Sequence, residues 1–404
     1  MNNSFLLALS NKFLFLITYC LCPLSFFIPR GGVILLGICG IIGYLRQGFN
    51  IYPLLRKSFI VCFLILISWV GISSLWSVFW QGTLYLTFKL GVILILGLGW
   101  ARLVQSLDLI SFLKMKKYLL GGVITSIVLL NLEMFSNHMW EIWQQKSSAK
   151  AFVPLALTIS VAIWPCLSLF QGKLKNLGCI VLTSLSLQAL FLIDCDTAIL
   201  AVLCGIIGYY SCLSMPYLAI KFTKFIAFLL CLLTPIIFLA LLNPQNISIF
   251  NHSFPIRSYV HRLYIWEYVG QKISSNWILG YGGDSSRDES VGGETKQWPF
   301  LEKHGSTFIN SDAIPLHPHN LPLQLWLELG AIGALLGGML HFSSLNHIAS
   351  ITNFYKRAEF FAFFIASCLT FWVNLGCWQS WWLCTLGLII PLISSKNTGS
   401  NDLS

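Results

Sequence analysis

A short polar stretch before an apolar run, His317-Pro318-His319-Asn320, combines residue types that can carry out acid–base chemistry. Proline holds His317 in extended geometry, Asn320 is a favourable N-cap, and Pro322 fits a first helical turn. The pattern therefore predicts a helix that begins after Asn320, with His319 just before its N-terminus. The partial positive charge of a helix N-terminus attracts phosphate and disfavours imidazolium. We expect His319 to be neutral beside a bound phosphate, as a general base for a hydroxyl nucleophile requires.

Three polar residues, Asn320, Gln324 and Glu328, recur at intervals of four and form one stripe on the predicted apolar helix. An ionisable residue inside a membrane span is costly and is by default a candidate functional residue. The stripe predicts either contacts with a polar substrate or hydrogen bonds from Glu328 to a neighbouring helix. Gly330, in either case, favours close helix packing.

A second candidate site surrounds Arg262 and Trp266. Apolar residues at 265, 269 and 273 have helical spacing and Ser258 is a plausible N-cap, which predicts a short amphipathic helix on or near the membrane surface. Arg262 and Trp266 are four residues apart and share a helical face. The indole could therefore hold the guanidinium, and the planar guanidinium could still bind phosphate. The alternative is a surface arginine beside an interfacial tryptophan.

Two weaker signals complete the polar inventory. Gly280 and Gly282 lie in Asn-Trp-Ile-Leu-Gly-Tyr-Gly-Gly, residues 276–283, where glycine could let backbone amides approach a ligand or could simply form a turn. Asp194 and Asp196 flank the outer end of two apolar runs. They could bind a cation, serve as an acid or base, or belong to a solvated turn.

The elements that must position these residues are membrane helices. Apolar residues make up 56% of the chain and charged residues 10%, and several apolar runs approach the ~20 residues that a helix needs to cross a bilayer. The sequence predicts an all-α polytopic membrane protein with about twelve transmembrane helices. The predicted spans are 13–28, 32–45, 58–76, 84–101, 118–135, 151–170, 177–193, 197–215, 225–242, 323–340, 360–377 and 381–393. The net charge of +10 is scattered between these spans, so a nucleic-acid partner is not expected.

The distribution of lysine and arginine predicts the orientation. With both termini in the cytoplasm, the inside loops hold fifteen basic residues and the short outside loops hold three. The chain then divides into nine helices in residues 1–242, a periplasmic loop with short amphipathic helices in 243–322, and three helices with a cytoplasmic tail in 323–404. The loop holds five of the eight histidines. A loop of this length is usually functional.

The thirteen cysteines do not suggest a disulfide or zinc framework. Most lie inside apolar spans, the others lie near span ends, and none falls in the long polar segment. They are expected to behave as small hydrophobic residues, with no metal site.

In these residues the chain resembles the O-antigen ligase and O-antigen polymerase superfamily of bacterial surface-polysaccharide glycosyltransferases. The resemblance rests on the order of three motifs and on their placement around one long outside loop before the last three spans. The motifs are Arg-x-x-x-Trp (Arg262 to Trp266), Gly-Tyr-Gly (280–282), and His-Asn followed by Glu-x-Gly-x-x-Gly (His319-Asn320 and Glu328 to Gly333).

The resemblance implies an inverting transfer of a glycan from undecaprenyl diphosphate, without metal or cofactor, at the periplasmic face of the bacterial inner membrane. Arg262 would bind the diphosphate leaving group and His319 would deprotonate or orient the acceptor hydroxyl. Substrate contacts are expected from Arg257, Trp266, Gly280, Gly282, His317, Asn320, Gln324, Glu328 and Asp196. The acceptor is lipid A–core for a ligase and another repeat unit for a polymerase. A transporter that uses Glu328 and Asp196 as ion relays is the remaining alternative.

One position departs from the family pattern. Members commonly carry a second arginine at the outer start of the eighth span, where this chain has Asp196. A carboxylate cannot replace a cation that binds diphosphate. Either Arg257, Lys150 or Arg287 supplies the second charge, or the chemistry differs.

Overall fold

The computed structural model describes residues 3–50, 54, 57–136, 152–170, 172, 174–253, 257–302 and 305–394. Each predicted span falls on a helix. In the first part of the chain these helices, with two short 3-10 turns, are α1 (Asn3–Phe27), α2 (Gly31–Gln47), α4 (Ser58–Ile72), η1 (Ser73–Leu75), α5 (Trp80–Ser106), α6 (Leu109–Phe135), α9 (Val153–Cys166), η2 (Leu167–Leu169), α10 (Leu174–Leu192), α11 (Asp196–Ser214) and α12 (Pro216–Leu241). The last three are α15 (Leu321–Ala349), α16 (Phe354–Val373) and α17 (Ser380–Ser394).

By length and composition, seven helices of the described residues can cross a membrane: α4 with η1, α5, α6, α10, α11, α12 and α15. Four shorter apolar helices lie at 11–27, 31–47, 153–169 and 380–393. The first two turns of α16 carry the charged residues Lys356, Arg357 and Glu359. The polytopic helical architecture is thus confirmed, whereas the count of twelve spans stays a prediction.

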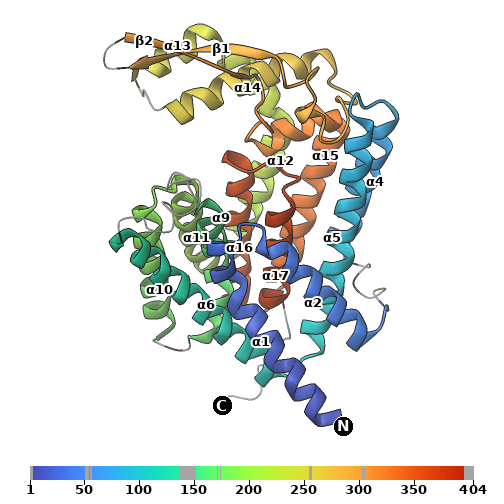
Figure 1. The fold of residues 1–404 in the computed structure, drawn as a ribbon, viewed down its shortest axis with the longest axis vertical. Helices are drawn as coiled ribbons and strands as arrows, with labels where there is room; N and C mark the ends of the chain where they lie inside the picture. Colours follow the sequence, from blue (N-terminus) through green and yellow to red (C-terminus); the bar gives the residue numbers. More distant parts are fainter. Residues whose placement is uncertain are drawn as a thin grey trace.

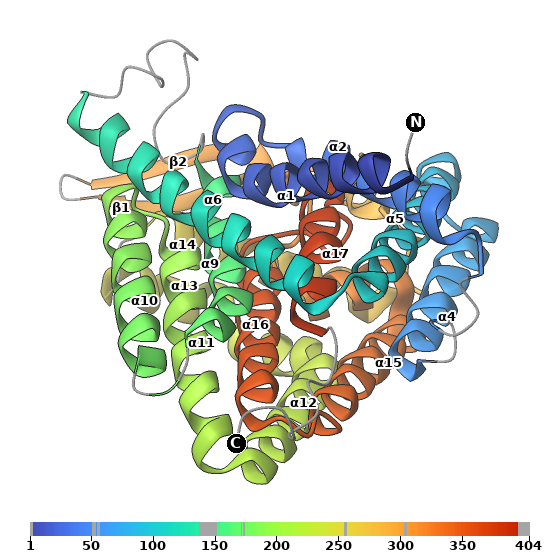
Figure 2. The ribbon, with the colours of Figure 1, turned by 90° about the horizontal axis from the view of Figure 1, so that it is seen from below.

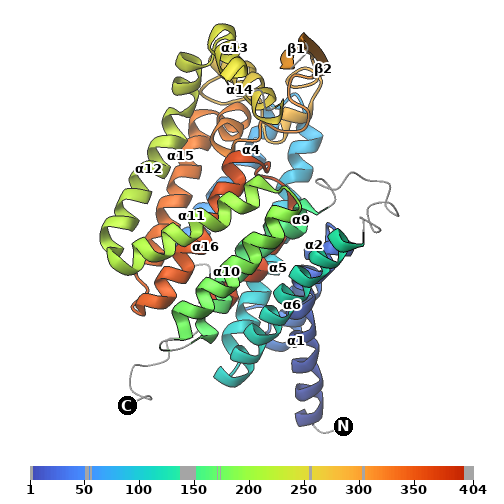
Figure 3. The ribbon, with the colours of Figure 1, turned by 90° about the vertical axis from the view of Figure 1, so that its left-hand side faces the viewer.

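The helices form a bundle with a cap at one end. Figure 1 shows the segment between α12 and α15 above the bundle, with the start of α1 at the opposite end, and Figure 3 shows the same arrangement from the side. Seen from below in Figure 2, α12, α15 and α16 lie next to one another, and α12 packs on α15 and α11 on α16.

The centre of the larger core is α9. Every residue from Leu155 to Cys166 is buried, as expected for a helix that is apolar on all sides and carries no charge. Phe152, Trp164 and Tyr209 are among the large side chains enclosed in this core. All thirteen cysteines are free, in agreement with their prediction as small hydrophobic residues.

The cap between α12 and α15 is not purely helical. It contains α13 (Pro244–Ser253), α14 (Arg257–Ser275), the 3-10 turn η3 (Ser285–Arg287) and a hairpin of β1 (Thr295–Glu302) with β2 (Gly305–Asp312). The strands are antiparallel, with Trp298 opposite Ile309. The all-α prediction missed this hairpin, because residues 243–322 were expected to form a loop with short amphipathic helices only. The ring of Trp298 stacks on Tyr264 of α14 at 5.0 Å between centroids, which joins the hairpin to the helix.

The amphipathic helix predicted around Arg262 is α14, but its apolar face does not lie on a membrane surface. Ile265, Val269 and Ile273 are buried in a small core that the cap shares with Leu323 and Leu327 of α15. The helix already begins at Arg257, so Ser258 lies in its first turn and is not the N-cap.

Candidate active site

The turn from His317 to Asn320 leads directly into α15, as predicted. The side chain of Asn320 accepts a hydrogen bond from the Leu323 N–H at 3.1 Å, and Pro322 lies in the first turn of the helix. The turn is therefore anchored to the helix end by its own sequence.

Two hydrogen bonds hold His319, one to the side chain of His317 and one to the backbone of Asn374. Its φ is +55°, a conformation that few non-glycine residues adopt. Its N–H donates to Nδ1 of His317 at 3.2 Å, and its own Nδ1 lies 2.6 Å from the carbonyl oxygen of Asn374, just after α16. Because a carbonyl oxygen can only accept, Nδ1 of His319 carries the proton and Nε2 carries the lone pair. Nε2 has no hydrogen-bond partner among the described residues, so it is available to accept a proton.

Both histidines of the turn have a lowered pKa. Burial is the main cause that lowers the pKa of His319 to about 4, and the charge of Arg262 lowers it further, against the opposing hydrogen bond to Asn374. Burial, followed by the charges of His319 and Arg287, lowers the pKa of His317 to about 3. His319 is therefore neutral near pH 7, with burial as the main reason; the helix terminus invoked from the sequence is not needed.

His317 is enclosed: only 4% of it is exposed. Its ring lies against Gly376, where an added Cβ would come within 2.8 Å of the imidazole Cγ, and its Nε2 lies 3.1 Å from the Gln379 amide nitrogen. The ring centroids of His317 and His319 are 4.2 Å apart. The enclosed ring of His317 is placed to orient His319, and its expected contact with a substrate stays a prediction.

Arg262 lies on α14 close to this turn. Its charge lowers the pKa of both His261 and His319, which places the guanidinium near the two rings. Within the described ranges, no hydrogen bond or ion pair holds the guanidinium. Burial lowers the pKa of Arg262, and the nearby Tyr259 and Asp196 oppose that shift. The side chain is thus half-buried, cationic and available to an anion.

Trp266 does not hold Arg262, contrary to the prediction. The indole stacks on Phe238 of α12 with 5.0 Å between centroids and an interplanar angle of 5°. Its Nε1–H donates to the carbonyl oxygen of Pro318 at 2.8 Å. Trp266 therefore fixes the turn that carries His319 to the helix that carries Arg262, and this bond brings the two predicted motifs together.

The backbone amides of Gly280 and Gly282 both donate hydrogen bonds within the protein, and their expected substrate contacts stay predictions. α15 is interrupted at Gly330, which has φ +67° and ψ −165°. The chain before the hairpin fills this break: Tyr281 N–H donates to Leu327 O at 2.9 Å and Gly282 N–H to Glu328 O at 2.7 Å. The amide of Gly280 donates to a carbonyl of its own turn. Backbone groups freed by a broken membrane helix need such partners.

The space at this junction leaves no room for a side chain. A Cβ on Gly330 would lie 2.1 Å from the Ile278 carbonyl oxygen, and a Cβ on Gly280 would lie 2.5 Å from the Glu328 carbonyl carbon. Both residues also have positive φ. The Gly-Tyr-Gly and Glu-x-Gly motifs, distant in sequence, are therefore two halves of one structural joint.

Glu328 is fully buried and its carboxylate accepts four hydrogen bonds. The donors are Asp284 N–H at 2.8 Å, Ser286 Oγ at 2.8 Å, Gln324 Nε2 at 2.9 Å, and Trp378 Nε1. The Gln324 carbonyl in turn accepts from Cys377 N–H at 3.0 Å. The polar stripe of α15 thus connects the cap to the chain between α16 and α17, so the hydrogen-bonding interpretation describes Glu328 and Gln324 better than substrate contact.

We expect Glu328→Ala to destabilise the protein by at least about 3 kcal/mol, because several buried donors would each lose a partner that contributes roughly 1–3 kcal/mol. Thermal unfolding of the purified protein in one detergent measures the change. Glu289→Ala removes an exposed carboxylate and serves as the control. Equal melting temperatures for the two variants would contradict this role of Glu328.

Asp196, which stands where a second arginine was expected, acts electrostatically on Arg262. Asp196 is the first residue of α11, is exposed, and accepts a hydrogen bond from the Tyr259 hydroxyl at 2.8 Å. Of the proposed substitutes for that arginine, Lys150 and the side chain of Arg257 lie outside the described residues. Arg287 is exposed, donates from Nε to Asp284 at 2.9 Å, and lowers the pKa of His317. Arg287 is therefore a cation that the fold brings towards the histidine turn.

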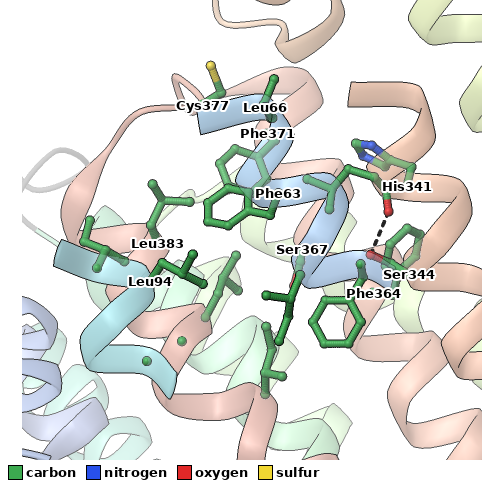
Figure 4. Close-up of a pocket in the computed structure, with 18 of the residues that line it drawn as sticks. Phe63, Leu66, Leu94, His341, Ser344, Phe364, Ser367, Phe371, Cys377 and Leu383 are labelled. Atoms are coloured by element: carbon green, nitrogen blue, oxygen red, sulfur yellow. Dashed lines mark hydrogen bonds between the residues drawn. The ribbon is translucent and has the colours of Figure 1, made fainter. Parts of the chain in front are cut away.

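An apolar cavity of 360 Å³ lies inside the bundle between α4, α5, α15, α16 and α17. Figure 4 shows part of its lining, including Phe63, Leu94 and Phe371, with Cys377 at one edge. Neither His319 nor Arg262 lines it, but Leu321, the residue after the cap Asn320, does. The cavity thus starts beside the histidine turn and continues into the apolar part of the bundle.

Sequence reasoning missed three groups that hold the site: the Asn374 carbonyl, the Gly376 backbone and the Tyr259 hydroxyl. A backbone carbonyl leaves no signal in a sequence. In the part of the chain that the structure describes, His, Cys, Asp and Glu side chains form no group of three that could hold a metal ion.

Residues 177–337 match the family model described as O-Antigen ligase. This region runs from α10 into α15 and includes Asp196, Arg262 and His319. The superfamily resemblance drawn from the motifs is therefore confirmed.

Three rickettsial proteins that carry the provisional name polysaccharide ligase are similar to the chain. The Rickettsia conorii protein is 28% identical over 320 residues, which cover 78% of this chain and 74% of that protein. The Rickettsia felis protein is 28% identical over 356 residues, or 85% and 81% of the two chains. The Rickettsia bellii protein is 30% identical over 278 residues, or 67% and 64%.

Proposed function

From the O-antigen ligase-like sequence of this chain, we propose that it transfers a glycan from undecaprenyl diphosphate to an acceptor sugar at the periplasmic face of the inner membrane. The observation that carries the proposal is the pairing of two available groups. The lone pair on His319 Nε2 and the guanidinium of Arg262 are both without protein partners in the described ranges, and the Trp266–Pro318 hydrogen bond holds their segments together.

In the proposed reaction, Arg262 binds the diphosphate, for which its planar fork is suited. Nε2 of His319 takes the proton from the acceptor hydroxyl, and the oxygen attacks the anomeric carbon of the donor. The bond from that carbon to the phosphate oxygen breaks, and undecaprenyl diphosphate leaves with the electron pair. Attack opposite the leaving group inverts the anomeric configuration. No step requires a metal or a cofactor.

The tautomer of His319 is suited to this step. Its Nδ1–H donates to the Asn374 carbonyl, so the proton taken up at Nε2 produces an imidazolium that keeps this hydrogen bond. The apolar cavity that begins at Leu321 offers a path inside the bundle for part of the isoprenoid chain of the donor.

We favour a ligase that attaches polysaccharide to lipid A–core, because the similar rickettsial proteins are named as polysaccharide ligases. A null mutant tests this choice. Loss of long glycan from lipid A–core with intact lipid-linked polymer supports the ligase. Single-repeat caps on lipid A–core would instead indicate a polymerase.

The proposed base should keep its activity in mild acid. Because the pKa of His319 is lowered to about 4, its lone pair stays available as the pH falls from 7.5 to 5.5. A histidine with the ordinary pKa of about 6.5 would be roughly 90% protonated at pH 5.5, and the rate would fall about tenfold. We therefore expect kcat/KM for glycan transfer by the purified protein to be nearly constant over this range. A loss centred near pH 6.5 would contradict a neutral, buried base.

Asp196 should weaken donor binding. Its carboxylate lies near Arg262, where the donor diphosphate is proposed to bind, and it repels that anion. Asp196→Asn keeps an acceptor for the Tyr259 hydroxyl and removes the charge, so we expect the donor KM to fall about three- to tenfold. Asp194→Asn makes the same change two residues earlier, at another exposed position of the turn. Asp194→Asn is the control and should leave the donor KM unchanged. If Asp196→Asn also leaves the donor KM unchanged, or raises it, the diphosphate binds elsewhere.

A further inference from the structure

A second cavity, of 880 Å³, lies at the end of the bundle opposite to His319. It is enclosed by the beginning of α12, the end of α15 and the beginning of α16, with one contribution from α4. These helices lie next to one another in Figure 2. The cavity is far from the histidine turn and is not used in the proposed glycan transfer.

The charged side chains that line this cavity are all basic. Lys221 and Lys224 of α12 and Arg357 of α16 line it, and its lining contains no acidic side chain. Lys224 Nζ lies 2.5 Å from the Asn346 side-chain oxygen and 5.1 Å from the centre of the Phe342 ring. Its only described partners are thus a neutral amide and an aromatic ring, so its charge is not neutralised there.

Arg357 adds a third positive charge. One of its terminal nitrogens donates to the neutral Ile351 carbonyl at 3.3 Å, and no acidic side chain of the described residues forms an ion pair with it. An anionic group in the cavity would supply the missing counter-charge.

The remaining wall is apolar and exposed. Tyr217 is 77% exposed, Phe342 47% and Met339 44%, and all three line the cavity beside the lysines. A cationic group at the end of membrane helices next to exposed aromatic and aliphatic surface matches a molecule with an anionic head and apolar chains. A soluble anion would use only the cations and leave this wall uncovered.

We propose that this cavity binds an anionic phospholipid, with Lys221, Lys224 and Arg357 around the headgroup phosphate and with Tyr217, Phe342 and Met339 along its acyl chains. The positive charge of the cavity and its apolar wall both favour this occupant. The bound lipid would connect α12, α15 and α16 at the end where these helices start or finish.

Binding of phosphatidylglycerol and phosphatidylcholine to the delipidated full-length protein, measured by native mass spectrometry, tests the proposal. We expect phosphatidylglycerol to bind with clear preference, and Lys221→Gln/Lys224→Gln to weaken its binding about 25-fold, since each basic residue near a membrane surface contributes about fivefold. The control variant is Lys114→Gln/Lys117→Gln, which removes the same charge from exposed positions on α6 outside the cavity.

Three results would overturn the proposal. The first is equal binding of the two lipids, and the second is an equal loss of phosphatidylglycerol binding in the two double variants. The third is full displacement of phosphatidylglycerol by an equal concentration of soluble glycerol phosphate, which would indicate an anion site without a lipid. Thermal unfolding in neutral detergent confirms that each variant is folded, so a loss of binding cannot be attributed to misfolding.

Discussion

His319→Ala is expected to lower the turnover of glycan transfer by about 10²- to 10⁴-fold, the usual contribution of a general base. The variant loses the only group whose lone pair, on Nε2, is proposed to take the acceptor proton. Single-turnover transfer by the purified protein measures the effect with donor and acceptor both saturating, so that weaker binding does not mask it.

His347→Ala is the matched control for this experiment. His347 lies near the opposite end of α15, and its ring contacts Phe59 and Phe360. The same substitution there should leave transfer within about twofold of the wild type if the protein stays folded. Wild-type turnover in His319→Ala would remove His319 from the mechanism.

Arg262→Gln is expected to lower kcat/KM for the donor by about 10²- to 10³-fold, because charge on the departing diphosphate is stabilised more strongly in the transition state than in the ground state. Arg262→Lys should recover part of this loss, since it restores the charge but not the planar fork. Steady-state kinetics with varied donor measure both variants.

Lys272→Gln provides the control on the same helix. Its ammonium group is exposed and contacts the Tyr268 ring and the Ser290 carbonyl, away from the histidine turn. A comparable loss in Lys272→Gln would mean that any positive charge on α14 acts at long range. Full activity of Arg262→Gln would assign the diphosphate to another cation, for which Arg287 is a candidate because it acts on the pKa of His317.

The sequence was sufficient to predict the local features of the site. Asn320 caps α15 as expected, because capping depends on residues within one turn of each other. The apolar runs coincide with helices, because a long apolar run in a membrane protein must satisfy its own backbone hydrogen bonds. The departure from the family pattern at Asp196 stays a prediction, and the structure adds that Asp196 acts electrostatically on Arg262.

Contacts between distant segments could not be predicted. The indole of Trp266 was expected beside Arg262, since both lie on one helical face, but Phe238 and Pro318 offer it a stacking partner and a carbonyl. The break of α15 at Gly330 depends on a segment about fifty residues earlier that supplies its hydrogen bonds. The hairpin depends in the same way on packing against Tyr264. A single sequence carries no record of such partners.

The motif residues therefore fall into two sets, one with a structural role and one proposed to contact the substrate. Gly280, Gly282, Gln324 and Glu328 belong to the joint that connects the cap to the bundle, and His317 and Trp266 orient the catalytic turn. His319 and Arg262 are the two groups proposed to touch the substrate. Mutations in the first set should therefore reduce stability together with activity, whereas mutations in the second should reduce activity alone.

The most direct test of the account is to reconstitute the purified protein with an undecaprenyl-diphosphate-linked glycan and lipid A–core and to quantify both products. We predict that each glycan transferred releases one undecaprenyl diphosphate, with inverted anomeric configuration, and that both products disappear together in His319→Ala. Transfer with retained configuration, or product formation that persists in His319→Ala, would contradict the proposal that His319 activates the acceptor for direct attack on the donor.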